Sequence, residues 1–135
     1  MSAVVLDSSA LVRLLLPDGP IPPGAEEALR RAERDEMTLL APELILVESA
    51  HVLHKKRQQG YINADEQKEL LADMLSVPLR LFGHPLLVTR ALALAQEQAI
   101  SVYDAFFLAL AEKNNVRLIT ADAKLLRVAE RLHLA

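Results

Sequence analysis

The chain has 135 residues, of which 52% are hydrophobic, and this size and apolar content predict one domain with a buried core. It contains no cysteine, which excludes disulfides and thiolate metal sites. The net charge of −3 argues against a general polyanion-binding protein, and the apolar run at residues 3–6 is too short for a signal peptide or a membrane span. We therefore expect a cytoplasmic, soluble protein that does not associate with membranes.

Short apolar runs alternate along the chain with longer segments of helical periodicity. The predicted strands cover residues 4–6, 37–40, 79–82 and 117–120. Predicted helices cover residues 9–16, 24–34, 42–59, 64–75, 85–98, 102–114 and 123–131, and residues 17–20 form a loop. Gly60 is expected to end the third helix and Asn63 to cap the fourth. The alternation predicts an α/β domain with a mostly parallel central sheet.

Four carboxylates lie in segments that a parallel sheet can bring together. Asp7 ends the first predicted strand, and Asp122 follows the last predicted strand by two residues. Asp104 stands at the start of a predicted helix, and Glu48 stands about two turns into another. Because ligands bind beyond the carboxyl ends of parallel strands, we expect the four side chains to meet in one crevice.

Three of these carboxylates also have a purely structural interpretation. Asp7 or Ser8 can cap the helix that follows the first strand, and Asp122 can cap the last helix in the same way. Ser101 and Asp104 have the spacing of a capping box. Taken one at a time, each of the three aspartates fits a capping role better than a chemical one.

Glu48 differs because no predicted helix end is near enough to explain its charge. Its neighbours at three and four residues are apolar, namely Leu44, Ile45 and Val52. An unpaired carboxylate on an apolar stripe is costly to bury, so it needs a cation or a shifted pKa. The alternative is that Glu48 points sideways to solvent beside Ser49.

Together the four carboxylates predict a site for a hard divalent cation. Carboxylate oxygens in a crevice with few histidines favour Mg²⁺ or Mn²⁺ over Zn²⁺. Such a cation can activate water and stabilise an in-line displacement at phosphorus. Asp7 would be the first ligand, and Ser8 and Ser9 would hydrogen-bond the carboxylate shell.

The segments that carry these acids resemble the successive acidic motifs of the PIN domain family, in the same order and at similar distances: "VVLDSSALV", "APELILVESAHVLHKKRQQGYI", "SVYDAFFLALAE" and "RLITADAKL". Stand-alone PIN domains of this size are most similar to VapC-type toxins of prokaryotic toxin–antitoxin pairs. The resemblance covers essentially the whole chain. It implies a three-layer α/β/α sandwich in which residues 1–135 form a single nuclease domain.

The resemblance also implies an activity, a site and partners. The activity would be a Mg²⁺- or Mn²⁺-dependent endoribonuclease, with RNA as substrate and a cognate antitoxin as protein partner. Asp7, Asp104 and Asp122 would hold the ion, and Glu48 would bind it through water or complete a second site. Thr120 matches a position where the family commonly has a hydroxyl that supports the site.

Other segments have less specific interpretations. Arg13, one to two turns after Asp7, is a candidate for contact with substrate or a partner. The basic run at residues 54–57 suits a helix C-terminus through the macrodipole, with phosphate steering as the weaker interpretation. Glu48 and His51 form half of a di-iron motif whose second copy is absent from the sequence. The Leu and Ala residues of "LLVTRALALAQ" are core or dimer face, and we expect a homodimer.

Two other functions would use part of the same residues. A receiver-type phosphoacceptor domain would use Asp7, Thr120 and Lys124, but it needs paired acids after the first strand, where Ser8 follows Asp7. An inactive PIN scaffold would only bind RNA or protein. The complete set of four acids argues against the scaffold.

Overall fold

The computed structural model describes residues 2–16 and 18–135, so Pro17 of the predicted loop lies outside the described residues. Within these ranges the chain forms four strands, β1 (Ser2–Leu6), β2 (Met37–Pro42), β3 (Leu79–Phe82) and β4 (Leu118–Ile119). The same ranges contain seven helices, α1 (Ser8–Leu15), α2 (Ala25–Glu33), α3 (Leu44–Gln58), α4 (Ala64–Ser76), α5 (His84–Gln98), α6 (Val102–Asn114) and α7 (Ala123–Arg131). None of these helices is long and apolar enough to cross a membrane. The predicted alternation of strands and helices is confirmed.

The strands form one parallel sheet in the order β3-β2-β1-β4. β1 pairs with β2 on one side and β4 on the other, and Val5 lies opposite both Leu40 and Leu118. The chain therefore runs outward from β1 to β3 and then returns to the opposite side of β1. The strand order reverses between β1 and β4, and open α/β sheets bind ligands at such a reversal.

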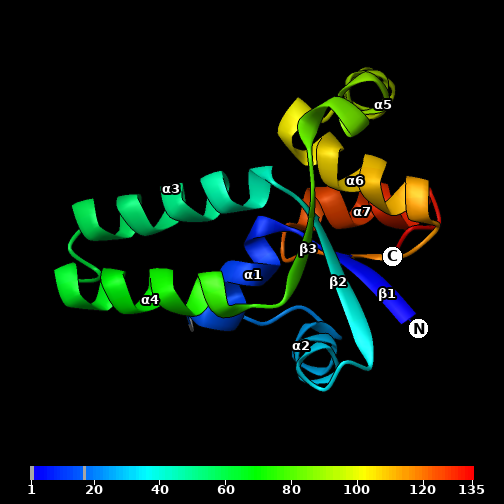
Figure 1. Ribbon diagram of the computed structural model, residues 1–135. Helices are drawn as coiled ribbons and strands as arrows, with labels where there is room; N and C mark the ends of the chain where they lie inside the picture. The colour runs from blue at the N-terminus through cyan, green and yellow to red at the C-terminus, as the bar shows by residue number, and fades with distance from the viewer. Residues whose placement is uncertain (1, 17) are drawn as a thin grey trace.

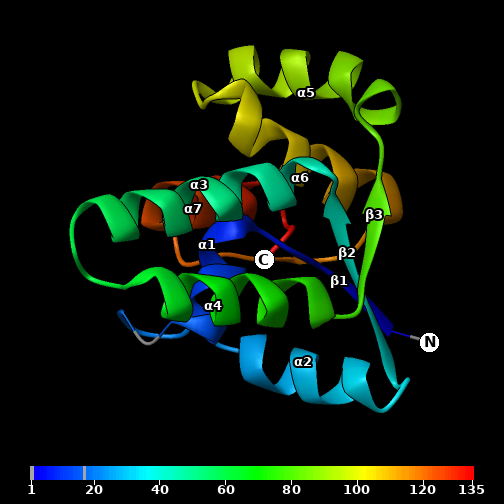
Figure 2. The same cartoon turned by 60° about the vertical axis from the view of Figure 1, so that its left-hand side comes forward.

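Helices cover both faces of the sheet, which confirms the three-layer prediction. α6 packs against β1, β2 and β4, α5 packs against α6, and α2 contacts β2. Figures 1 and 2 show α2 and α6 on opposite sides of the sheet. Because α6 lies between the sheet and α5, every residue from Ala105 to Ala111 is buried. A helix that is buried on all sides in this way has apolar residues on all of its faces.

α3 and α4 form a hairpin that extends away from the sheet next to α1 (Figure 1). Gly60 follows α3 with a φ of 80°, a conformation that glycine adopts readily, so the predicted end of this helix is confirmed. Asn63 caps α4, as predicted, in a capping box with Glu66. The hairpin holds α3 against α1, close to the end of β1.

Pro42 belongs to β2, whereas the sequence pattern predicted that a helix begins at this residue. Pro42 is fully buried and lies opposite Phe82 of β3. A proline disfavours helical backbone in the residue before it, which keeps Ala41 extended and lets the strand continue. The backbone N–H of Glu43 then donates to the carbonyl of Phe82 at 2.9 Å. The helix consequently spans Leu44–Gln58 rather than residues 42–59.

Candidate active site

Asp7 is buried at the carboxyl end of β1, with only 4% of its surface exposed. Its Oδ1 accepts hydrogen bonds from the hydroxyl of Ser9 at 2.7 Å and from the backbone N–H of Ala10 at 2.9 Å. Its Oδ2 accepts a hydrogen bond from the hydroxyl of Thr120 at 2.5 Å. Asp7 is thus the N-cap of α1, and the same carboxylate lines a pocket.

Ser9 and Thr120 join the end of β1 to the turn that follows β4. The hydroxyl of Thr120 accepts from the backbone N–H of Asp122 at 3.0 Å, and the hydroxyl of Ser9 accepts from the backbone N–H of Ala121 at 2.9 Å. Both hydroxyls also donate to Asp7. The orientation of Asp7 is therefore determined by groups on both sides of the reversal in strand order.

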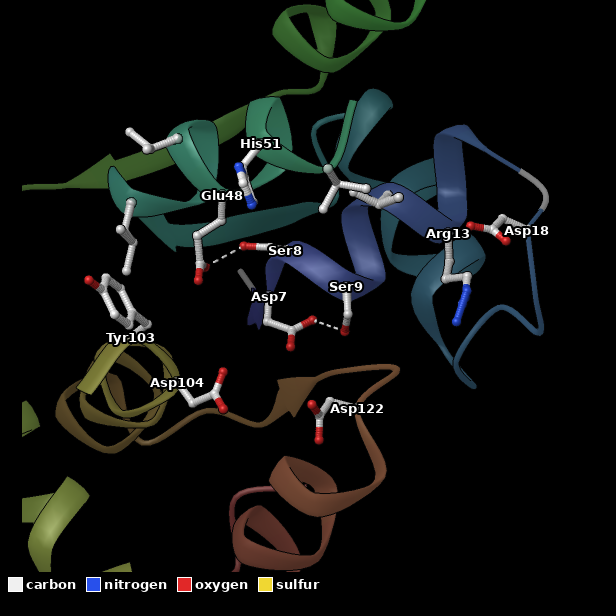
Figure 3. A pocket seen from close by; sticks show the side chains of 14 residues that line it. Asp7, Ser8, Ser9, Arg13, Asp18, Glu48, His51, Tyr103, Asp104 and Asp122 are labelled. Atoms are coloured by element: carbon white, nitrogen blue, oxygen red, sulfur yellow. Dashed lines mark hydrogen bonds between the residues drawn. The ribbon is translucent and has the colours of Figure 1, made fainter. Parts of the chain in front are cut away.

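Glu48 is half-buried on α3 and points toward the start of α1. The hydroxyl of Ser8 donates to Oε1 of Glu48 at 2.7 Å (Figure 3). Ser49, beside it, is buried on the inner face of the helix. Glu48 therefore has a hydroxyl partner and a place on the pocket wall rather than a fully solvent-exposed position.

Asp104 lies in the first turn of α6, and Asp122 immediately precedes α7. The backbone N–H of Asp104 donates to the hydroxyl of Ser101 at 3.0 Å, and Oδ1 of Asp122 accepts from the backbone N–H of Leu125 at 2.9 Å. Ser101 and Asp122 are the N-caps of the two helices. Asp122 caps α7 with its own carboxylate, as expected, whereas Ser101 caps α6 by accepting from the backbone N–H of Asp104. Both carboxylates line the same cavity.

The four acids line one pocket with a volume of about 760 Å³. Figure 3 shows Asp7, Glu48, Asp104 and Asp122 around a common space, each from a different element. In the part of the chain that the structure describes, no three acidic or histidine side chains are close enough together to form a preassembled metal cage. The pocket lining itself is rich in carboxylate oxygens, the ligands that a cation such as Mg²⁺ prefers, and Mg²⁺ keeps several waters when proteins bind it.

Burial and mutual repulsion disfavour the charged forms of Asp7, Glu48 and Asp104. The pKa of Asp7 is raised to about 6, mainly by burial and to a smaller extent by the charge of Asp104, while the hydrogen bonds from Thr120, Ala10 and Ser9 lower it. Burial, and then the charge of Asp104, also raise the pKa of Glu48. The pKa of Asp104 is raised by burial and by Asp122, with Ser101 opposing. A cation in the pocket would relieve this repulsion.

Sequence reasoning did not identify Tyr103 or Asp18 as pocket residues, and it considered His51 only in the half-motif with Glu48 or as a surface or partner-facing residue, although all three line the cavity. Tyr103 precedes Asp104 on α6, and 62% of its surface is exposed. The feature that could have identified Tyr103 is its position as an exposed aromatic residue on a helix whose other aromatic residues, Phe106 and Phe107, are buried. Unlike His51, His54 is not among the pocket residues, and both histidines are exposed.

The basic run at residues 54–57 has local partners. Lys56 forms an ion pair with Asp18 and lies over the ring of Tyr61, with Nζ 5.1 Å from the centroid. Arg57 donates to the side chain of Gln67 at 2.8 Å. These contacts join the end of α3 to the loop after α1 and to α4. They favour the structural interpretation of the run over phosphate steering.

The sequence of the chain is similar to those of known proteins. A family model described as the PIN domain matches residues 4–131. Ribonuclease VapC3 from Pyrobaculum aerophilum is 30% identical over 124 residues, which represent 90% of this chain and 91% of that protein.

Solved structures share the fold. PAE2754 from Pyrobaculum aerophilum matches with a TM-score of 0.70 and 24% identity, over 93% of this chain and 78% of its own. VapC20 from Mycobacterium tuberculosis, a Sarcin-Ricin loop cleaving toxin, matches with a TM-score of 0.63 and 18% identity, over 93% and 94%. VapBC2 from Rickettsia felis, bound to a promoter DNA fragment, matches with a TM-score of 0.64 and 15% identity, over 93% and 92%.

Proposed function

Because the chain belongs to the PIN domain family, we propose that it is a metal-dependent endoribonuclease and the toxin component of a type II toxin–antitoxin pair. The observation that carries the proposal is the position of four carboxylates around one pocket at the reversal in strand order. The similarity to Ribonuclease VapC3 supports RNA as the substrate. In this proposal residues 1–135 form a single nuclease domain.

The donor set of the pocket fits Mg²⁺ or Mn²⁺, because carboxylate oxygens from four elements face it. Asp7, Asp104 and Asp122 would hold the ion, and Glu48 would bind it through water or complete a second site. When bound, the ion supplies positive charge to the scissile phosphate and makes water more acidic.

The protein residues orient the reacting groups. Ser9, Ala10 and Thr120 fix the carboxylate of Asp7, and Oδ2 of Asp7 receives only one of these hydrogen bonds. Ser8 fixes Oε1 of Glu48, so Oε2 can accept from a water molecule on the pocket side. Preorganised acceptors of this kind hold an attacking water in line without further rearrangement.

Two partners follow from the same proposal. A toxin–antitoxin complex from Klebsiella pneumoniae shares the fold, with a TM-score of 0.58 and 20% identity over 90% of this chain and 88% of its own, and this supports a cognate antitoxin here. A homodimer is supported by α5, which buries Leu87, Ala91 and Leu94 but exposes Leu86 and Leu92. The exposed leucines offer an apolar face for a second copy. As part of the same proposal, we expect the protein to act in the cytoplasm.

Cleavage of RNA by the purified protein tests the function. Total cellular RNA is incubated with Mn²⁺ and with wild type, Asp104→Asn or Glu130→Gln, the last being a matched control because Glu130 is an exposed acid on α7. We expect wild type and Glu130→Gln to cut RNA and Asp104→Asn and EDTA-treated wild type to leave it intact. An Asp104→Asn protein as active as wild type would refute the site. A folded wild type that never cuts RNA would favour an inactive scaffold.

A further inference from the structure

Arg13 is the one arginine or lysine among the described residues that line the acidic pocket. It stands on α1 four residues after Ser9, so both side chains lie on the same face of the helix. Ser9 holds Asp7, and Figure 3 shows Arg13 on the opposite side of Ser9 from Glu48. The guanidinium therefore lies at one end of the cavity, on the side away from Glu48.

The guanidinium of Arg13 forms no ion pair within residues 2–16 and 18–135, although Asp18 lies near it. Its Nε is buried and makes no hydrogen bond there, and none of the ion pairs in these ranges includes Arg13. Asp18 is near enough for the charge of Arg13 to contribute to lowering its pKa, but the larger cause is the hydrogen bond from Lys56, with which Asp18 forms an ion pair. Arg13 thus retains donors for an external acceptor.

Gly19 determines where this guanidinium lies. A Cβ atom added to Gly19 would lie 2.6 Å from Nη1, 2.7 Å from Cζ and 2.9 Å from Nε of Arg13. The φ of Gly19 is not positive, so the glycine is needed for the space it leaves and not for its backbone conformation. Because the obstructing atoms are the end of a flexible side chain, Gly19→Ala would displace the guanidinium while the fold adapts.

The loop that contains Gly19 is itself anchored. The ion pair between Asp18 and Lys56 connects the loop to α3, and the two side chains are only 32% and 23% exposed. The backbone N–H of Asp18 also donates to the carbonyl of Leu16 at 2.8 Å. α3 therefore holds the loop against Arg13, and the guanidinium is positioned before any ligand binds.

We propose that Arg13 binds a backbone phosphate of RNA next to the phosphate that is cleaved, and that Gly19 holds its guanidinium in place. The inference rests on the proposed function. A guanidinium matches a phosphate through two parallel hydrogen bonds, and a polyanion that enters a carboxylate-lined pocket needs a cation beside the metal site. The carboxylates would bind the ion at the scissile phosphate, and Arg13 would neutralise the charge of the adjacent backbone phosphate.

The test measures binding of a fluorescein-labelled, mixed-sequence single-stranded RNA of 20 nucleotides, in millimolar Mg²⁺, to full-length protein that carries Asp104→Asn to prevent cleavage. In this background we compare Arg13→Gln, Gly19→Ala, the pair combined, and Arg127→Gln, an exposed arginine on α7, as the control. We expect Arg13→Gln and Gly19→Ala each to weaken binding about tenfold, as the loss of one charged contact does. The combined variant should be no weaker than Arg13→Gln, and Arg127→Gln should bind like its parent.

Salt dependence separates a phosphate contact from a structural effect. Loss of one phosphate contact reduces the slope of log affinity against log salt by about 0.7 for a single strand. We expect this reduction for Arg13→Gln and Gly19→Ala. Unchanged affinity, an unchanged slope, or additive losses in the combined variant would each overturn the inference while leaving the nuclease intact. A folded parent that binds no RNA would overturn the proposed function, and this inference with it.

Discussion

Thr120 donates a hydrogen bond of 2.5 Å to Oδ2 of Asp7, although 113 positions separate the two residues in sequence. β1 and β4 are neighbours in the sheet, so their carboxyl ends bring the two side chains together. The contact spans the reversal in strand order, and it fixes a carboxylate that also caps α1. One hydrogen bond thus connects the topology of the sheet to the geometry of the candidate site.

Thr120→Val should lower both stability and cleavage. Valine has the shape of threonine but leaves Oδ2 of Asp7 without its donor, and an unsatisfied buried acceptor costs about 1–3 kcal/mol. We expect a loss of this size in the free energy of unfolding, measured by urea denaturation, and reduced RNA cleavage. Thr89→Val on α5 is the control, because Thr89 is exposed. Equal stability of the two variants would show that the hydrogen bond contributes little.

Asp7→Asn should stabilise the metal-free protein at neutral pH while it abolishes cleavage. The pKa of Asp7 is raised from 3.8 to about 6 in the folded state, so the folded protein binds more protons than the unfolded chain between these values. Stability therefore falls as pH rises from about 4 to about 6, by on the order of 3 kcal/mol. Asparagine does not titrate and remains a good N-cap.

Urea denaturation in EDTA at several pH values measures this effect. The contribution of Asp7 at each pH is the free energy of unfolding of wild type minus that of Asp7→Asn. This difference should be larger near pH 4 than at neutral pH. At pH 7.5 the variant should be the more stable protein. A variant that is less stable than wild type by the same amount at every pH would contradict the assignment of the pKa shift to Asp7.

Binding of Mn²⁺ should stabilise the native state, because a cation relieves the repulsion among the four carboxylates. At about a hundredfold excess over the dissociation constant, the gain should approach 2.7 kcal/mol. Affinity should rise with pH through about 6, as Asp7 loses its proton. Thermal melting with and without millimolar Mn²⁺ is the measurement. Glu130→Gln should respond like wild type, and a melting temperature of wild type that Mn²⁺ leaves unmoved would argue against a metal site.

The sequence was sufficient to predict the α/β architecture because strand and helix periodicities differ and alternate clearly. It also indicated Glu48, since a carboxylate between Leu44 and Val52 has no local explanation. The end of β2 could not be predicted, because Pro42 suits the first turn of a helix and its pairing with Phe82 depends on an edge strand far along the chain.

The contact between Gly19 and Arg13 was also beyond sequence reasoning. The loop pattern at residues 17–20 indicates a turn, and a glycine in a turn is usually explained by its backbone conformation. Here the glycine is needed for space, and that requirement arises only when the ion pair of Asp18 and Lys56 brings α3 to the loop. Local patterns do not contain such a contact, because it depends on how α1 and α3 pack.

The antitoxin should compete with the metal for the pocket. Val47 and Tyr103, which are 66% and 62% exposed, form an apolar rim beside Glu48 and Asp104. We expect an amphipathic segment of the antitoxin to place apolar side chains along this rim near α3 and to direct an arginine or lysine at the acids. By linkage, Mn²⁺ and the antitoxin must then weaken each other by the same factor.

Calorimetric titration of the cognate antitoxin into the protein, with and without Mn²⁺, measures this coupling. Val47→Asp is the matched variant: Val47 is exposed, so the substitution should weaken antitoxin binding while the metal-free fold stays intact. Antagonism in wild type would mean that the antitoxin silences the nuclease by occupying the acidic pocket. Equal antitoxin affinities in the two buffers would exclude this mechanism, and inhibition would then have to arise from a partner that blocks RNA without reaching the carboxylates.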